Sequence, residues 1–174
     1  MSHNACVMPI LLVLLGWAAQ PATAATGLLA RWNLDEGAGA LVKDTSGKAC
    51  NCEVHGAKWA SGPTGPVLDF DGTSAYVAVL DPLVGNLSGS FTIAFWMEPY
   101  AWADQYSTGI VSKKLDDAHV GCVVYADGTV PTKITLRITG TQGGHGMLTS
   151  ASDVDENLWQ HWAVTYEAAS QTLS

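Results

Sequence analysis

The strongest structural signal in the chain lies in residues 90–99, which read SFTIAFWMEP. Its large apolar side chains alternate with others, so an extended backbone would place them along one face: Phe91, Ile93, Phe95 and Met97. Burying that face would contribute about 1.5–3 kcal/mol per side chain, or about 6–12 kcal/mol in all. The net stability of a whole domain is comparable, about 5–15 kcal/mol. We therefore predict a central strand of a β-sandwich, ended by Pro99.

Short apolar runs and turn sequences alternate along the rest of the chain, and no window beyond the N-terminal segment shows a sustained helical period. Turns every 8–12 residues are typical of an antiparallel β-sandwich. The turn at residues 71–74, DGTS, predicts a hairpin between the runs that flank it. Further strands are predicted at residues 28–34, 53–59 (broken at Gly56), 67–70, 75–80, 109–113, 121–125, 133–139, 147–150, 159–166 and from 172 onward.

The charge balance of the chain limits its partners. The 174 residues include 8 Lys and Arg against 16 Asp and Glu, a formal charge of −8. Binding to a nucleic-acid backbone needs clustered cations, so we expect no nucleic-acid partner. The sequence also holds 7 Trp, a residue that fills sandwich cores and forms flat platforms for sugars.

The N-terminus resembles a secretory signal. Residues 7–19, VMPILLVLLGWAA, form an apolar run, and Ala22-x-Ala24 follows as a cleavage site. The run is shorter than the about 20 residues of a membrane-spanning helix, and no second segment could span a bilayer. We expect a signal peptide at residues 1–24, a domain at 25–174, and a secreted, periplasmic or cell-surface location. A buried N-terminal helix is the alternative.

Three cysteines would remain in the exported chain: Cys50, Cys52 and Cys122. Export favours a disulfide, although three cysteines cannot all pair within one chain. Cys50 could pair with Cys52, or either could pair with Cys122. A metal site built from Cys50, Cys52 and His55 is the alternative, but its spacing fits no common zinc module.

Six motifs in order resemble the LamG-like jelly-roll domain of the concanavalin A-like lectin/glucanase superfamily. The resemblance implies an all-β antiparallel sandwich with jelly-roll topology. In that family a hairpin and several closing strands follow the last motif, so we expect a domain that is incomplete at its C-terminus and exposes strand edges. The motifs are ARWNLDEGAG (30–39), KDTSG (43–47), LDFDGTSAYV (68–77), SFTIAFWMEP (90–99), GIVSK (109–113) and WQHWAVTY (159–166).

Two groups of residues are candidate binding sites. Tyr100, Trp102 and Tyr106 cluster after the predicted central strand and could stack on a pyranose ring, or fold back over the core. The second group consists of carboxylates in glycine-rich turns that could hold calcium, which the resemblance implies for some members of the family: Asp35, Asp44 and Asp71. The alternative is that these carboxylates cap their own turns.

Residues 153–157, DVDEN, could be a carboxylate pair of a glucanase or a calcium loop. The resemblance places this acidic stretch in a loop before residue 159, and it lacks the ligands of an EF-hand, so a solvated turn is favoured. His161 is interpreted as a hydrogen-bonded structural residue rather than a general base.

We therefore expect a non-catalytic recognition module that binds a carbohydrate or an extracellular protein, as part of a longer protein. The alternatives are a fragment of a jelly-roll glycoside hydrolase and a purely structural adhesion or spacer domain. No cofactor is expected apart from the calcium considered above.

Overall fold

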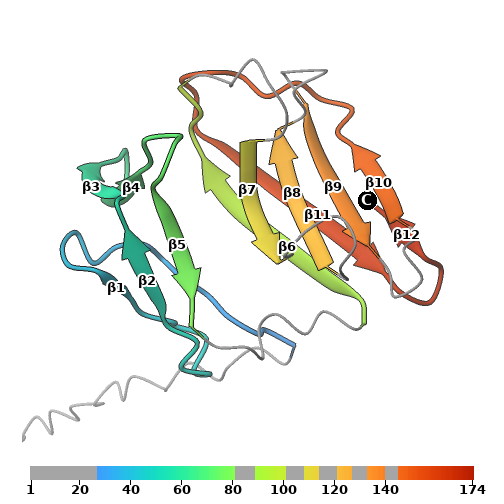
Figure 1. Cartoon of the computed structure of the whole chain (residues 1–174), viewed down its shortest axis with the longest axis horizontal. Coiled ribbons are helices and arrows are strands. Elements are labelled where there is room, and N and C mark those ends of the chain that lie inside the picture. Colours follow the sequence, from blue (N-terminus) through green and yellow to red (C-terminus); the bar gives the residue numbers. More distant parts are fainter. Residues whose placement is uncertain (1–26, 81–88, 101–107, 114–120, 127–132, 140–144) are drawn as a thin grey trace, which may run out of the picture.

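The computed structural model describes residues 27–80, 89–100, 108–113, 121–126, 133–139 and 145–174. Every strand pairing among them is antiparallel, which confirms the predicted all-β fold (Figure 1). Within these ranges, no helix has the length and apolar composition needed to cross a bilayer. The strands are β1 (Leu41–Val42), β2 (Cys52–His55), β3 (Lys58–Ser61), β4 (Pro66–Asp69), β5 (Tyr76–Val79), β6 (Phe91–Met97), β7 (Thr108–Lys113), β8 (Gly121–Ala126), β9 (Ile134–Thr139), β10 (His145–Thr149), β11 (Gln160–Glu167) and β12 (Thr172–Leu173).

Two sheets formed by the second half of the chain hold the main hydrophobic core. One sheet has the order β10-β9-β8-β7 and the other β12-β11-β6. The core lies between them, centred on Val124, Leu136 and Val164, which are buried. Along β8 every second residue is buried, as expected for a strand with one face on a core. Period-2 alternation in the sequence therefore located this core correctly.

The first half of the chain forms a three-stranded sheet, β1-β2-β5, and a hairpin of β3 and β4, drawn in blue to green in Figure 1. Val42 and Cys52, which are register partners on β1 and β2, are both buried. The predicted strand at residues 28–34 is reduced to a single bridge between Trp32 and Asp44. The Trp32 indole N–H also donates to the carbonyl of Cys50 at 2.7 Å, which ties this segment to the sheet.

Strand β6 has the predicted faces but a different place in its sheet. Its alternate apolar side chains pack against the core, as predicted. Among the described strands, however, β6 pairs with β11 alone and so borders its sheet. The predicted central position is not seen among the described strands, since alternation reports which face is buried and not how many neighbours a strand has. As a result Ile93 on β6 stays partly exposed, whereas its partner Val164 on β11 is 7% exposed.

The predicted hairpin across residues 71–74 does not form. The turn is present, but β4 pairs with β3 and β5 pairs with β2, so the two flanking strands enter different sheets. The Asp71 carboxylate holds the turn by accepting hydrogen bonds from the backbone N–H groups that follow it. A turn signal therefore predicted the change of direction and not the strand partner.

We expect Ile93→Asp to destabilise the fold severely, because it places a charge on the inward face of β6. A loss of at least about 3 kcal/mol should lower Tm by about 10 °C or more. The neighbouring Ala94 faces outward and is exposed, so Ala94→Asp is the matched control and should change Tm little. Thermal unfolding followed by circular dichroism measures both; similar melting of the two variants would contradict the assignment of the faces.

Candidate binding surface

The outer face of the β6–β11 pair carries an exposed aromatic pair. Trp96 on β6 lies directly opposite His161 on β11. Their ring centroids are 5.1 Å apart with an interplanar angle of 50°. Trp96 is 65% exposed and His161 is also exposed. An indole held against a neighbouring ring on a hydrogen-bonded sheet is a rigid, accessible apolar surface.

The residues beside this pair are small. Ala94 lies opposite Ala163, and Thr92 lies opposite Thr165, with their hydroxyl oxygens 3.1 Å apart. The side chains that share this face with Trp96 are therefore methyl and hydroxyl groups, which are much smaller than its indole. The resulting surface offers both apolar contact and hydroxyl donors and acceptors.

A third aromatic residue lies at the same end of the sheet. Tyr100 follows shortly after β6 and is 61% exposed. The neighbouring carbonyl of Pro99 accepts a hydrogen bond from the N–H of Asn157 at 2.7 Å, which joins the end of β6 to the turn before β11. We call Trp96, His161 and Tyr100, with the alanine and threonine pairs beside them, the Trp96 face.

The sequence predicted only part of this surface. Tyr100 is exposed, whereas Trp102, Tyr106 and the predicted signal peptide at residues 1–24 lie outside the described residues. Trp96 could have been found from its position, because a large aromatic on the polar side of an alternating strand has no place in the core. His161, interpreted from the sequence as a hydrogen-bonded structural residue, is exposed and lies against the Trp96 ring.

The carboxylate of Asp44, a calcium candidate, is saturated by hydrogen bonds from its own turn. One oxygen accepts the N–H groups of Arg31 and Ser46, and the other accepts the Ser46 hydroxyl and the N–H of Cys50, over distances of 2.7–3.0 Å. Burial raises the pKa of this carboxyl, but these hydrogen bonds outweigh it and hold the pKa well below its usual range. Asp44 therefore joins residues 31 and 44–50 into one unit.

Asp71 is engaged in the same way. Its carboxylate accepts the N–H groups of Ala75, Thr73 and Ser74 and the Ser74 hydroxyl, each at 2.9 Å, and these bonds hold its pKa well below the usual range. Asp35 accepts a long hydrogen bond, 3.4 Å, from the side chain of Asn33. The described residues contain no group of three His, Cys, Asp or Glu side chains that could hold a metal ion. The hydrogen bonds of Asp44 and Asp71 thus match the turn-capping alternative.

The acidic stretch at residues 153–157 connects two elements instead of presenting a carboxylate pair on a strand. Val154 is buried in the core cluster. Asp153 lies 2.7 Å from the ammonium of Lys133, which also donates to the carbonyl of Ala151 at 2.6 Å. Asn157 takes a left-handed backbone conformation, φ 58°, which turns the chain toward β11.

The sequence of residues 71–174 matches the family model described as the concanavalin A-like lectin/glucanases superfamily. The chain belongs to this superfamily. No curated protein matches it. Among solved structures, it is similar to the binding domain of Paraclostridial Mosquitocidal Protein 1, with a TM-score of 0.60 and 17% sequence identity. That match covers 76% of this chain and 35% of the other, and at this identity it shows the shared fold alone.

The cysteines of this lectin/glucanase domain are all buried thiols, so the structure shows no disulfide among the three that it describes. Cys52 lies on β2, whereas Cys122 lies on β8 within the sandwich core. Burial raises the pKa of each of these two thiols to about 11, and nearby Asp44, Cys50 and Glu36 add to the effect at Cys52. The predicted disulfide does not form among these cysteines. A bond between Cys52 and Cys122 would have to join separate sheets, and Cys50 and Cys52, although close in sequence, are not bonded to each other.

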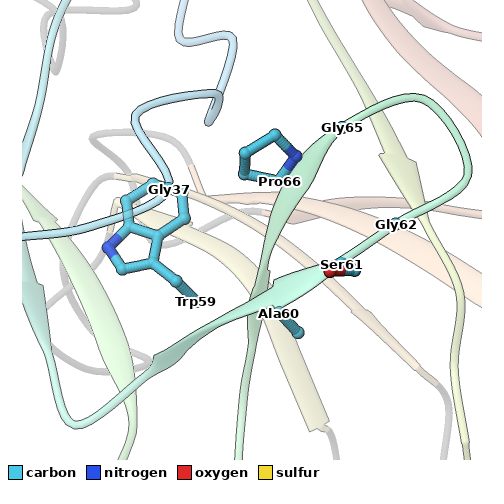
Figure 2. A pocket seen from close by; sticks show the side chains of 7 residues that line it. All are labelled: Gly37, Trp59, Ala60, Ser61, Gly62, Gly65 and Pro66. Carbon is cyan, nitrogen blue, oxygen red and sulfur yellow. The ribbon is translucent and has the colours of Figure 1, made fainter.

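The lectin/glucanase domain also has an open hollow of about 410 Å³ beside the β3–β4 hairpin (Figure 2). The indole of Trp59 forms one side and is held by a 2.8 Å hydrogen bond from its N–H to the carbonyl of Gly39. None of the lining residues is ionisable, so the hollow offers packing and no acid–base chemistry. The lining consists of Gly37, Trp59, Ala60, Ser61, Gly62, Gly65 and Pro66.

We expect the hydrogen bonds of Asp44 to make the fold acid-sensitive. The folded-state pKa lies below that of the unfolded chain, about 3.9. Asp44 therefore stabilises the fold above about pH 4, and this contribution is lost as the pH falls toward the folded-state pKa. Asp44→Asn should lower Tm at neutral pH and reduce the further loss on acidification. Asp69→Asn, on the exposed side of β4, is the control; equal acid dependence of both variants would refute the assignment.

Proposed function

We propose that the chain is a carbohydrate-binding module whose Trp96 face stacks on a sugar ring. The observation that carries the proposal is the exposed indole of Trp96, which stands among small side chains on a rigid sheet. Leaving so large an apolar surface in water forgoes the free energy of burying it, and such surfaces mark binding sites. Membership of a superfamily that includes lectins supports the same function.

The chemistry of the Trp96 face suits a pyranose. A sugar ring has an apolar face of C–H groups and a rim of hydroxyls, so it can use an aromatic ring and polar groups together. Trp96 and Tyr100 supply aromatic rings, while Thr92, Thr165 and His161 supply donors and acceptors around them. A few placed polar groups would then give orientation and specificity.

The proposal favours recognition over hydrolysis. A glycoside hydrolase needs two carboxyl groups that flank the scissile bond, about 5–5.5 Å apart in retaining enzymes. In the acidic stretch, Asp153 is paired with Lys133 and Val154 is anchored in the core, so this segment has a structural use. Export of the chain is part of the proposal and is supported by the apolar run at residues 7–19 and the Ala22-x-Ala24 sequence.

We expect Trp96→Ala to weaken glycan binding by about 2 kcal/mol or more, a factor of about 30, because truncating a central Trp usually has this effect. A glycan array would identify the ligand, and isothermal titration calorimetry would measure its affinity for both proteins. Tyr76→Ala is the matched control. Tyr76 is also an exposed aromatic residue, 54% exposed, and it stacks on His55 within the β1-β2-β5 sheet, away from Trp96. It should bind as the parent does.

Two outcomes would favour the alternatives. If the folded chain binds no glycan on the array but captures an extracellular protein through Trp96, the module recognises proteins. If it releases reducing sugar from a β-glucan, it is an enzyme, and the carboxylates would then need to be tested one by one.

A further inference from the structure

We propose that the Trp96 face selects sugars that carry a protonated amine, so that its ligands are amino-sugar polymers with free amino groups. This inference rests on the proposed function and concerns the charge of the ligand. It follows from a separate observation, which is the distribution of charged residues around the face.

The sheet that carries the Trp96 face has acidic residues and no Lys or Arg. Residues 89–100 and 155–174 contain β6, β11, β12 and the turns beside them. They include no Lys or Arg, although the whole chain has 8. Their four carboxylates are Glu98, Asp155, Glu156 and Glu167.

Three of these carboxylates lie at the same end of the sheet as Trp96. Glu98 comes two residues after Trp96 and is partly exposed. Asp155 and Glu156 are exposed in the turn before β11, and the Gln160 side chain donates to the carbonyl of Asp155 at 2.8 Å. Because Gln160 lies opposite Met97, this turn is held near the end of β6.

The fourth carboxylate serves a structural role at the other end. Glu167 accepts hydrogen bonds from the Ser90 hydroxyl at 2.8 Å and from the N–H of Ala169 at 3.3 Å. The nearest described ion pair joins Lys133 to Asp153, just before the turn that holds Asp155 and Glu156. The ammonium of this lysine therefore contacts the carboxylate of Asp153. Among the described residues of these two segments, the carboxylates at the Trp96 end of the sheet are therefore Glu98, Asp155 and Glu156.

An indole face and nearby carboxylates attract the same kind of ligand. A cation over the ring of a tryptophan is drawn to its electron-rich face, and carboxylates within a screening length of about 8 Å add to that attraction. A sugar with a carboxylate or sulfate would be repelled by the same groups and by the chain's formal charge of −8. A protonated amino sugar meets both requirements, since it keeps the apolar ring face and adds the positive charge.

The test compares two oligosaccharides of the same linkage, a glucosamine hexamer with free, protonated amines and an N-acetylglucosamine hexamer whose nitrogens are acetylated and uncharged. At a pH that keeps the amines protonated, we expect the glucosamine hexamer to bind about tenfold more tightly by calorimetry. The difference should shrink between about 50 mM and about 500 mM salt, because salt screens exposed charges. A uronic-acid hexamer should bind most weakly.

Variants that replace a single carboxylate by a neutral amide test which residue attracts the amine. Glu98→Gln should weaken binding of the glucosamine hexamer severalfold and leave the N-acetylated hexamer unchanged. Glu53→Gln is the matched control, because it removes the same charge from an exposed position on β2, in the β1-β2-β5 sheet.

The outcomes separate the two proposals. Equal affinity for the charged and acetylated hexamers, lost in both cases on Trp96→Ala, would overturn the selection of amines and leave the carbohydrate-binding function standing. Binding of the glucosamine hexamer that survives Trp96→Ala would also overturn it, because the attraction would then be non-specific. Binding of none of these hexamers and of no glycan on the array would contradict the proposed function itself.

Discussion

The pairing of β6 with β11 is the constraint on which the core and the candidate binding surface both depend. The register runs from Phe91 opposite Tyr166 to Met97 opposite Gln160. It places Ile93 and Val164 together on the inward face and Trp96 and His161 together on the outward face. A slip of one residue would move every side chain of one strand to the opposite face. The hydrophobic core therefore fixes the position of the exposed aromatic pair.

Hydrogen bonding by carboxylates has a comparable role in the first half of the chain. Asp44 and Asp71 each accept four hydrogen bonds from nearby N–H and hydroxyl groups, and these bonds stabilise the turns that carry them. A carboxylate that is saturated in this way has little capacity left for a cation. The acidic composition of the chain is thus used partly for turns and partly for the potential around Trp96.

Membership of the concanavalin A-like lectin/glucanases superfamily establishes the architecture of the chain. It does not determine the chemistry, which depends on the side chains exposed at the surface. The same sandwich can carry a carboxylate pair, a metal site or an aromatic platform, and each depends on a few exposed side chains. In this chain the described surface offers an aromatic platform, whereas Asp44, Asp71 and Asp153 are engaged within the fold. The proposed recognition of a sugar ring follows from that difference.

The sequence alone determined the fold class, the family and most strands, because alternation of apolar side chains is a local property of consecutive residues. It identified β6, β9 and β11 and the turn at Asp71. Only the tertiary structure decided which strands pair: β4 joins β3 and not β5, and β6 borders its sheet among the described strands. It also decided that Cys52 and Cys122 lie in separate sheets and that the Trp96 ring contacts His161. Such pairings join residues far apart in the chain, and they depend on how whole sheets close over a shared core, which no local pattern encodes.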